Sequence, residues 1–236
     1  MSKEIDDISE YILKVFNNVK LVDSDLIPNI DLYMDQVTNF LEKQLASQKR
    51  MPDDKVMTKT MINNYAKNDL LPSPVKKKYN KEHILLLIFI YYFKNILSIN
   101  DIQLLFEPLT KKYFGNDDSF SLKDIYEEVI KLNNNQEEML KEDVINKFKI
   151  IADAFEKKNI AFTDELSDDE RDFLIFFGYI CSLLFDIYSK KRLVEKLMDQ
   201  YSEKLTVSGN GKEKSRERVK EKSKTKERAK TNKEAK

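Results

Sequence analysis

Apolar residues recur at three- and four-residue steps along most of this chain, and this periodicity constrains the fold more than any other feature. In the first segment, for example, Ile5, Ile8, Ile12 and Phe16 fall on one face of a helix. Gly and Pro, which interrupt helices, number only 4 and 5 in 236 residues. The pattern therefore predicts an all-α protein.

Local start and stop signals divide this pattern into segments. Thr58, Asn80, Ser98 and Ser167 are suitable N-caps. The pattern predicts helices over residues 5–16, 30–45, 59–68, 81–93, 99–114, 121–158 and 167–204, the sixth interrupted near residues 133–135. Pro72 and Pro74 stop the third helix, and residues 76–79 are expected to form an extended connection.

The formal net charge of zero conceals a segregation of charge along the chain. Residues 49–83 carry 9 Lys/Arg against 4 Asp/Glu, whereas residues 117–206 carry 13 against 21. Residues 207–236 carry 12 against 5, and residues 211–236 include one valine and no larger apolar residue, so we expect a disordered basic tail. The two basic stretches are candidates for holding a polyanion, although simple solvation explains the tail equally well.

The third predicted helix has an apolar back and a polar front. Met61, Ile62 and Tyr65 lie on the back. The front and the basic segment that follows the helix supply the candidate DNA-binding residues, which are Lys59, Thr60, Asn63, Asn64, Lys67, Lys76, Lys77 and Lys78. Amides pair with adenine edges and lysines neutralise phosphates, so this set of side chains favours DNA as a partner.

Three strings in this region resemble parts of MerR-type transcriptional regulators. Residues 61–72, MINNYAKNDLLP, are similar to the recognition helix and its exit. Residues 78–84, KYNKEHI, resemble the exit of the family's wing, and residues 97–102, LSINDI, resemble the start of its fourth helix. The whole chain, including residues 27–31 and 71–74, looks more like the bacterial family domain of unknown function 1836.

This resemblance implies a particular organisation. Residues 1–28 would form an N-terminal amphipathic helix, and residues 29–115 a MerR-like helix-turn-helix DNA-binding unit with a short wing. Residues 116–206 would form an acidic helical region, followed by the tail at 207–236. Two departures from the MerR pattern are Asn63, where an arginine is common, and Asp69, where a glycine is usual.

Three functional hypotheses follow. The first is a DNA-binding transcriptional regulator that reads a major groove with residues 58–68. The second is a protein–protein interaction module that has a MerR-like shape without reading DNA, which is motivated by the missing arginine and by the short connection from Pro72 to Tyr79 in place of a standard wing. The third is RNA binding through the basic tail. We expect no enzyme, because the sequence contains no phosphate-binding glycine motif and no nucleophile–base pairing.

The remaining features indicate no cofactor and no metal site. The lone histidine, His83, is expected to be a surface or capping residue, and the lone cysteine, Cys181, a buried core thiol. The longest uninterrupted apolar run, residues 84–93, is about ten residues, which is short of the ~20 that span a membrane. The N-terminus lacks the basic start of a signal peptide, so we predict a cytoplasmic protein without a membrane partner.

The C-terminal region is rich in aromatic residues, nine of which lie between Phe148 and Tyr188. We expect these residues to form a helical core, either within one chain or shared with a second copy in a homodimer. A pocket for a small-molecule effector, of a kind that the sequence does not identify, is the alternative.

Overall fold

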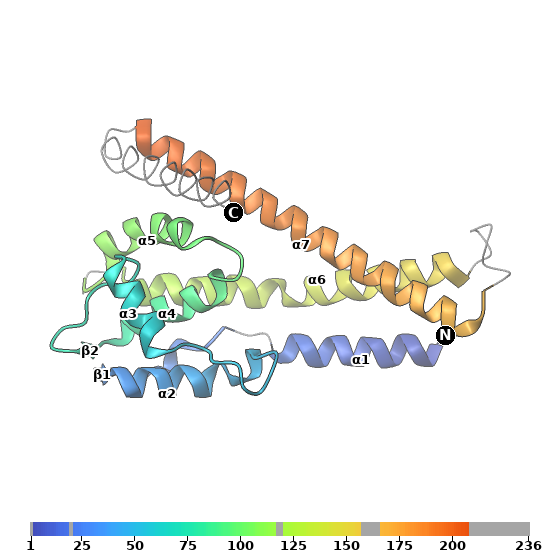
Figure 1. Ribbon diagram of the computed structural model, residues 1–236, viewed down its shortest axis with the longest axis horizontal. Coiled ribbons are helices and arrows are strands. Elements are labelled where there is room, and N and C mark those ends of the chain that lie inside the picture. Colours follow the sequence, from blue (N-terminus) through green and yellow to red (C-terminus); the bar gives the residue numbers. More distant parts are fainter. Residues whose placement is uncertain (1, 19–20, 117–119, 157–165, 208–236) are drawn as a thin grey trace, which may run out of the picture. The chain divides into compact units, whose positions relative to one another are not determined.

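The computed structural model describes residues 2–18, 21–116, 120–156 and 166–207, and these are predominantly helical (Figure 1). The described helices are α1 (Ser2–Asn18), α2 (Met34–Gln44), α3 (Lys59–Lys67), α4 (Lys81–Phe93), α5 (Ile99–Tyr113), α6 (Leu122–Glu156) and α7 (Asp168–Val207). Two short 3-10 helices, η1 (Ser24–Leu26) and η2 (Ala46–Gln48), flank α2. The all-α prediction is confirmed, with the exception of one small sheet.

The predicted helix starts are confirmed by their capping hydrogen bonds. The Thr58 hydroxyl accepts from the Met61 N–H at 3.2 Å, and the Asn80 side chain accepts from the His83 N–H at 3.1 Å. Ser98 caps α5 in the same way, and Ser167 caps α7. Each cap satisfies an N–H that the first turn of a helix leaves without a partner.

The sheet corrects two of the sequence-based predictions. Residues 32–33, which we expected to be helical, form β1 (Leu32–Tyr33). This strand pairs antiparallel with β2 (Lys78–Tyr79), so residues 76–79 do not form a simple extended connection. A strand of two residues is too short to show a periodic pattern. Its partner also lies more than 40 residues away in the sequence, so no local signal predicts the pairing.

Helix α6 is continuous through the three asparagines at which a break was predicted. The Asn133 side chain donates to the Val129 carbonyl at 2.8 Å, one turn earlier in the same helix. Asparagine competes with the backbone for hydrogen bonds in helices, but this bond is compatible with the helical conformation. The prediction of an interruption at residues 133–135 was therefore wrong.

The main hydrophobic core is built around α4. Every residue from His83 to Ile90 is buried, so this helix is covered on all sides rather than on one face. Two hydrogen bonds tie residues before α2 to the start of α6: Tyr126 Oη donates to the Val22 carbonyl, and Ser24 Oγ donates to Glu127, both at 2.5 Å. The core therefore joins residues on both sides of the boundaries predicted at residues 28 and 115.

A second, smaller core forms where α1 and the first half of α7 pack on α6. Ile12 of α1 is buried here together with Phe148 and Ala152 of α6. Tyr179 of α7 contacts the edge of the Phe148 ring, with 5.3 Å between ring centroids, and donates to the Val144 carbonyl at 3.2 Å. These contacts account for only part of the aromatic C-terminal region.

Many of the aromatic residues expected in that core are exposed instead. Phe173, Phe176, Phe177 and Phe185 are each more than half exposed, and Cys181 is half-buried rather than a core residue. By length and composition alone, α7 is apolar enough to cross a membrane, with a mean hydropathy of 1.5 in its most apolar window. This stretch is not an uninterrupted apolar run in the sequence, because Gly178 and Ser182 divide it.

The chain divides into two compact units, residues 1–187 and residues 188–236. The first contains both cores, the sheet and the first half of α7. The described part of the second is the rest of α7, up to Val207. The tail predicted to be disordered, residues 207–236, lies almost entirely outside the described residues.

Candidate nucleic-acid interface

Helix α3 presents the polar face that its sequence pattern indicates. Ile62 and Tyr65 are buried in the main core, and Met61 and Ala66 are half-buried beside them. The side chains of the opposite face are all exposed, namely Lys59, Thr60, Asn63, Asn64 and Lys67. Cations and amides therefore line the solvent side of a short helix that is held to the body by its apolar side.

The chain that leads into α3 is fixed at Val56. Glu42 of α2 accepts from the Val56 N–H at 3.3 Å, and Lys94 donates to the Val56 carbonyl at 3.1 Å. Lys49 forms an ion pair with Glu42, and this contact lowers the pKa of the Glu42 carboxyl. Because both backbone groups of Val56 are bonded to side chains of neighbouring helices, the start of α3 is held in place.

The end of α3 is a left-handed turn at Asp69, whose φ is 54°. The N–H groups of Leu70 and Leu71 both donate to the Tyr65 carbonyl, at 2.9 and 3.2 Å. This conformation is the usual C-terminal stop of a helix and normally favours glycine. Asp69 occupies the position where the MerR pattern has glycine, so the backbone requirement is met here by aspartate.

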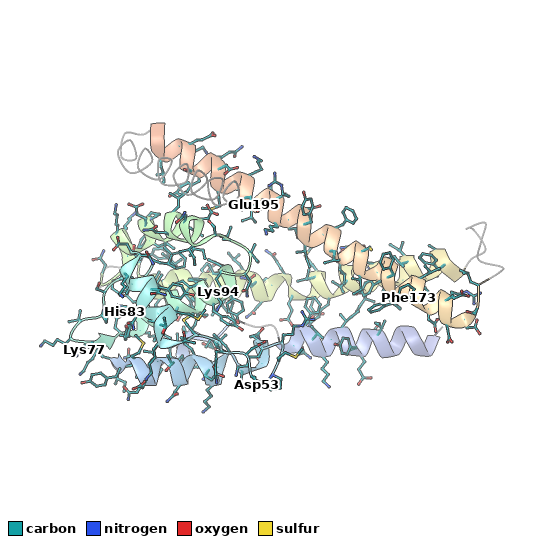
Figure 2. All side chains as sticks on the ribbon, in the orientation of Figure 1. Asp53, Lys77, His83, Lys94, Phe173 and Glu195 are labelled. Carbon is teal, nitrogen blue, oxygen red and sulfur yellow. The ribbon has the colours of Figure 1, made fainter. Side chains whose placement is uncertain are left out.

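A tight hairpin turn projects from the same part of the molecule. Val75 and Lys78 close it, with the Lys78 N–H donating to the Val75 carbonyl at 2.9 Å. Lys76 and Lys77, at the tip, have φ angles of 51° and 64°. Figure 2 shows Lys77 at the outer end of this turn, pointing away from the protein.

Positive φ at both central residues is the geometry of a type I′ turn, which is normally made by Asn-Gly. Lysine in this conformation costs about 1 kcal/mol or more per residue. The hairpin therefore places two exposed ammonium groups at its tip at the expense of backbone strain. Strain of this kind is a reason to consider a functional role.

The eight candidate residues differ in their surroundings. Lys59 forms an ion pair with Asp35 of α2. Lys78 is half-buried, with its ammonium group 5.4 Å from the centre of the Tyr33 ring. Within the described part of the chain, Lys67, Lys76 and Lys77 form no ion pair, which leaves them best placed to meet an anion.

His83 lies directly behind the hairpin and is almost completely buried, at 2% exposure. Its Nδ1 accepts from the Asn80 N–H at 3.1 Å, which confirms the predicted capping role. The rings of Tyr79 and Phe114 contact it edge-on. Burial lowers the pKa of the imidazole, and the backbone of Ser73 and Pro72 partly offsets this effect. A lone polar residue near a helix start gave no sign of this burial.

These features define a helical domain with a basic, amide-rich surface on α3 and the 75–78 hairpin. Residues 22–129 match the model of the family described as Domain of unknown function (DUF1836). The match coincides with the main core, which extends from Val22 to Tyr126. No curated protein and no solved structure matches the chain.

Among the described residues, no three His, Cys, Asp or Glu side chains form a group that could hold a metal ion. Two carboxylates near the basic surface serve other contacts. Asp35 pairs with Lys59, and Glu42 holds the backbone of Val56. The chemistry that this surface offers is therefore the binding of an anionic partner through ammonium groups and amides.

Proposed function

We propose that the exposed face of α3 and the tip of the 75–78 hairpin bind double-stranded DNA, as part of a transcriptional regulator. Asn63 and Asn64 would contact base edges in the major groove, and Lys67, Lys76 and Lys77 would contact phosphates. The observation that carries this proposal is the exposure of all five polar side chains on α3 next to a strained lysine turn.

The dimensions of α3 suit this role. A helix with its side chains is about 10–12 Å across, and the major groove is about 12 Å wide. Paired amides suit adenine, and each good base contact contributes about 1–3 kcal/mol of discrimination. Lysines add affinity that does not depend on sequence and that falls as the salt concentration rises.

The proposal rests on this surface rather than on a motif. The connection from α2 to α3 covers residues 45–58, whereas a helix-turn-helix is joined by a turn of about three or four residues. The resemblance of residues 61–72 to a MerR recognition helix supports the assignment of α3 as the reading element. The 75–78 hairpin is the counterpart of a short wing in this proposal.

The test begins with selection of bound fragments from genomic DNA by the full-length protein. Affinity for the selected duplex and for a random duplex is then measured by fluorescence anisotropy over a range of salt concentrations. We expect Asn63→Ala with Asn64→Ala to reduce the preference for the selected duplex at least tenfold. Lys67→Ala with Lys77→Ala should weaken binding to both duplexes and lower the salt slope by about 2.

The matched control removes two exposed lysines from another helix. Lys111 and Lys112 lie in the last turn of α5, and Lys111→Ala with Lys112→Ala makes the same change in net charge. We expect this variant to bind almost as the wild type does. Equal losses in the control and in the Lys67/Lys77 variant, or no preference for any genomic fragment, would contradict the proposal.

A protein–protein interaction module that does not read DNA is the second candidate. The long connection between α2 and α3 favours it, as does the ion pair that engages Lys59 with Asp35. In that case the full-length protein would retain one stoichiometric protein partner from cell extract after nuclease treatment. The same α3 variants would then reduce the retention of this protein.

A further inference from the structure

Helix α7 has two apolar faces within residues 173–187, and only one of them is covered. Ile175, Tyr179 and Leu183 pack into the second core, and Gly178 lies close to Ile151 and Phe155 of α6. Asp186, on the same side, forms an ion pair with Lys147 of α6 at 2.6 Å. This face of α7 is covered by contacts within the chain.

The opposite face is exposed and regularly spaced. Phe173, Phe177, Ile180, Leu184 and Ile187, which we call the α7 seam, follow one another at steps of four, three, four and three residues. All five are exposed, from 37% for Ile180 to 62% for Ile187. Alternating steps of three and four are the spacing with which one helix packs along another in a coiled coil.

The exposed area is large for a surface without a partner. Phe176 and Tyr188 flank the α7 seam and are 59% and 60% exposed. Since an aromatic side chain has about 150–250 Å² of surface, the seam and its flanks leave on the order of 700 Å² of apolar surface exposed. That approaches the ~800 Å² that each partner contributes to a standard protein interface.

The charges at the two ends of the α7 seam are complementary. Residues 168–172, DDERD, precede it with four acidic side chains and one basic, and residues 190–192, KKR, follow it on the same helix. If two copies of α7 pair antiparallel about Ile180, Phe173 of one copy lies beside Ile187 of the other. The acidic end of each copy then lies beside the basic end of its partner, whereas parallel pairing would place like charges together.

We propose that the α7 seam is the contact surface for a second copy of this chain, which pairs with it in antiparallel orientation. The same patch on both copies then buries itself around a twofold axis, as in most homodimers. A membrane is the less suitable occupant. Asp186 lies within the apolar stretch of α7, so a spanning α7 would carry this charge into the bilayer and break its ion pair with Lys147 of α6 or bury that charge too. This inference does not depend on the proposed DNA binding.

The first test measures the mass of the full-length protein by sedimentation equilibrium over a range of concentrations. We expect twice the chain mass of 27.9 kDa. Phe177→Glu with Leu184→Glu should weaken the association at least tenfold. The control, Leu132→Glu with Met139→Glu, adds the same charge at exposed apolar residues of α6 and should leave the dimer intact. Circular dichroism verifies that both variants are helical.

The orientation is tested by cross-linking in a Cys181→Ser background. Phe173→Cys and Ile187→Cys proteins, each oxidised alone, should stay uncross-linked, whereas their mixture should form a disulfide-linked pair. Efficient cross-linking of Phe173→Cys with itself would overturn the antiparallel arrangement. A wild-type protein that remains monomeric at all concentrations would overturn the proposal, as would a monomer that sediments with vesicles of phosphatidylcholine and phosphatidylglycerol.

Discussion

Single polar side chains buried in the main core fix separate parts of the chain to one another. Tyr126 is completely buried, and its hydroxyl satisfies the carbonyl of Val22, a residue about a hundred positions earlier in the sequence. His83 is buried behind the hairpin and bonded to the Asn80 backbone. A buried polar atom without its partner costs more than the bond itself contributes, so these contacts have measurable consequences.

Removal of the Tyr126 hydroxyl should destabilise the protein without disturbing its packing. Tyr126→Phe keeps the ring but leaves the Val22 carbonyl without its donor. We expect the free energy of unfolding, measured with urea, to fall by about 1–3 kcal/mol. The control is Tyr11→Phe, because the Tyr11 side chain is 65% exposed and its loss of a hydroxyl should have no effect. Equal stabilities for the two variants would show that the Val22 contact contributes nothing.

Protonation of His83 should oppose folding. Burial lowers the folded-state pKa of His83 below its usual value, so the unfolded chain takes up the proton first as the pH falls. The contribution of neutral His83 to stability is therefore complete above about pH 6.5 and decreases as the pH falls toward the folded-state pKa. Since the chain has one histidine, its ring signal in an NMR titration is unambiguous. A midpoint at or above 6.5 in the folded protein would be the contrary result.

At the scale of elements, the helices could be predicted from sequence because their signals are local. A cap such as Thr58 or Asn80 and the apolar repeat that follows it lie within a few residues of each other. The same reasoning predicted which side of α3 is polar. The pairing of β1 with β2 could not be predicted in this way, because two-residue strands have no period and their partner is distant in the sequence.

Two features of the candidate site and of α7 also escaped the sequence analysis, for different reasons. Lys76 and Lys77 adopt a turn that usually requires asparagine and glycine, so their residue types gave no turn signal. In α7, the spacing shows that two faces are apolar but does not show which of them another helix covers. The contacts of Tyr179, Gly178 and Asp186 with α6 distinguish the covered face from the exposed one.

Replacement of the two lysines at the tip of the 75–78 hairpin should raise the stability of the protein and lower its affinity for DNA. Lys76→Asn with Lys77→Gly supplies the residues that a type I′ turn favours. We expect thermal and urea denaturation to show a gain of about 1 kcal/mol, since the left-handed backbone is no longer strained. The affinity for random duplex DNA should fall, because two cations are lost from the tip.

The control for this experiment is Lys111→Asn with Lys112→Asn, which removes two cations from α5 without changing a turn. It should neither stabilise the protein nor weaken DNA binding. A hairpin variant that gains stability but keeps full affinity would remove the tip from the proposed interface. A variant that loses stability would show that the turn is not strained.

At the scale of the whole molecule, equal numbers of acidic and basic residues do not prevent the binding of a polyanion. Charges are screened over about 8 Å at physiological ionic strength, so a bound phosphate responds to the local surface and not to the net charge. The 75–78 hairpin and α3 lie within a stretch with an excess of five basic residues, 9 against 4. The acidic excess lies further along the chain, in residues 117–206.

The basic tail allows this argument to be tested on the molecule as a whole. Deletion of residues 207–236 removes 12 basic and 5 acidic residues. If the tail only adds nonspecific attraction, the shortened protein should bind random duplex several-fold more weakly at low salt and keep its preference for selected fragments. The α3 substitutions should then cause the same relative loss with and without the tail, because separate phosphate contacts contribute independently to the salt dependence. Complete loss of binding on deletion, with no further effect of the α3 substitutions, would instead assign nucleic-acid binding to the tail and leave α3 for another partner.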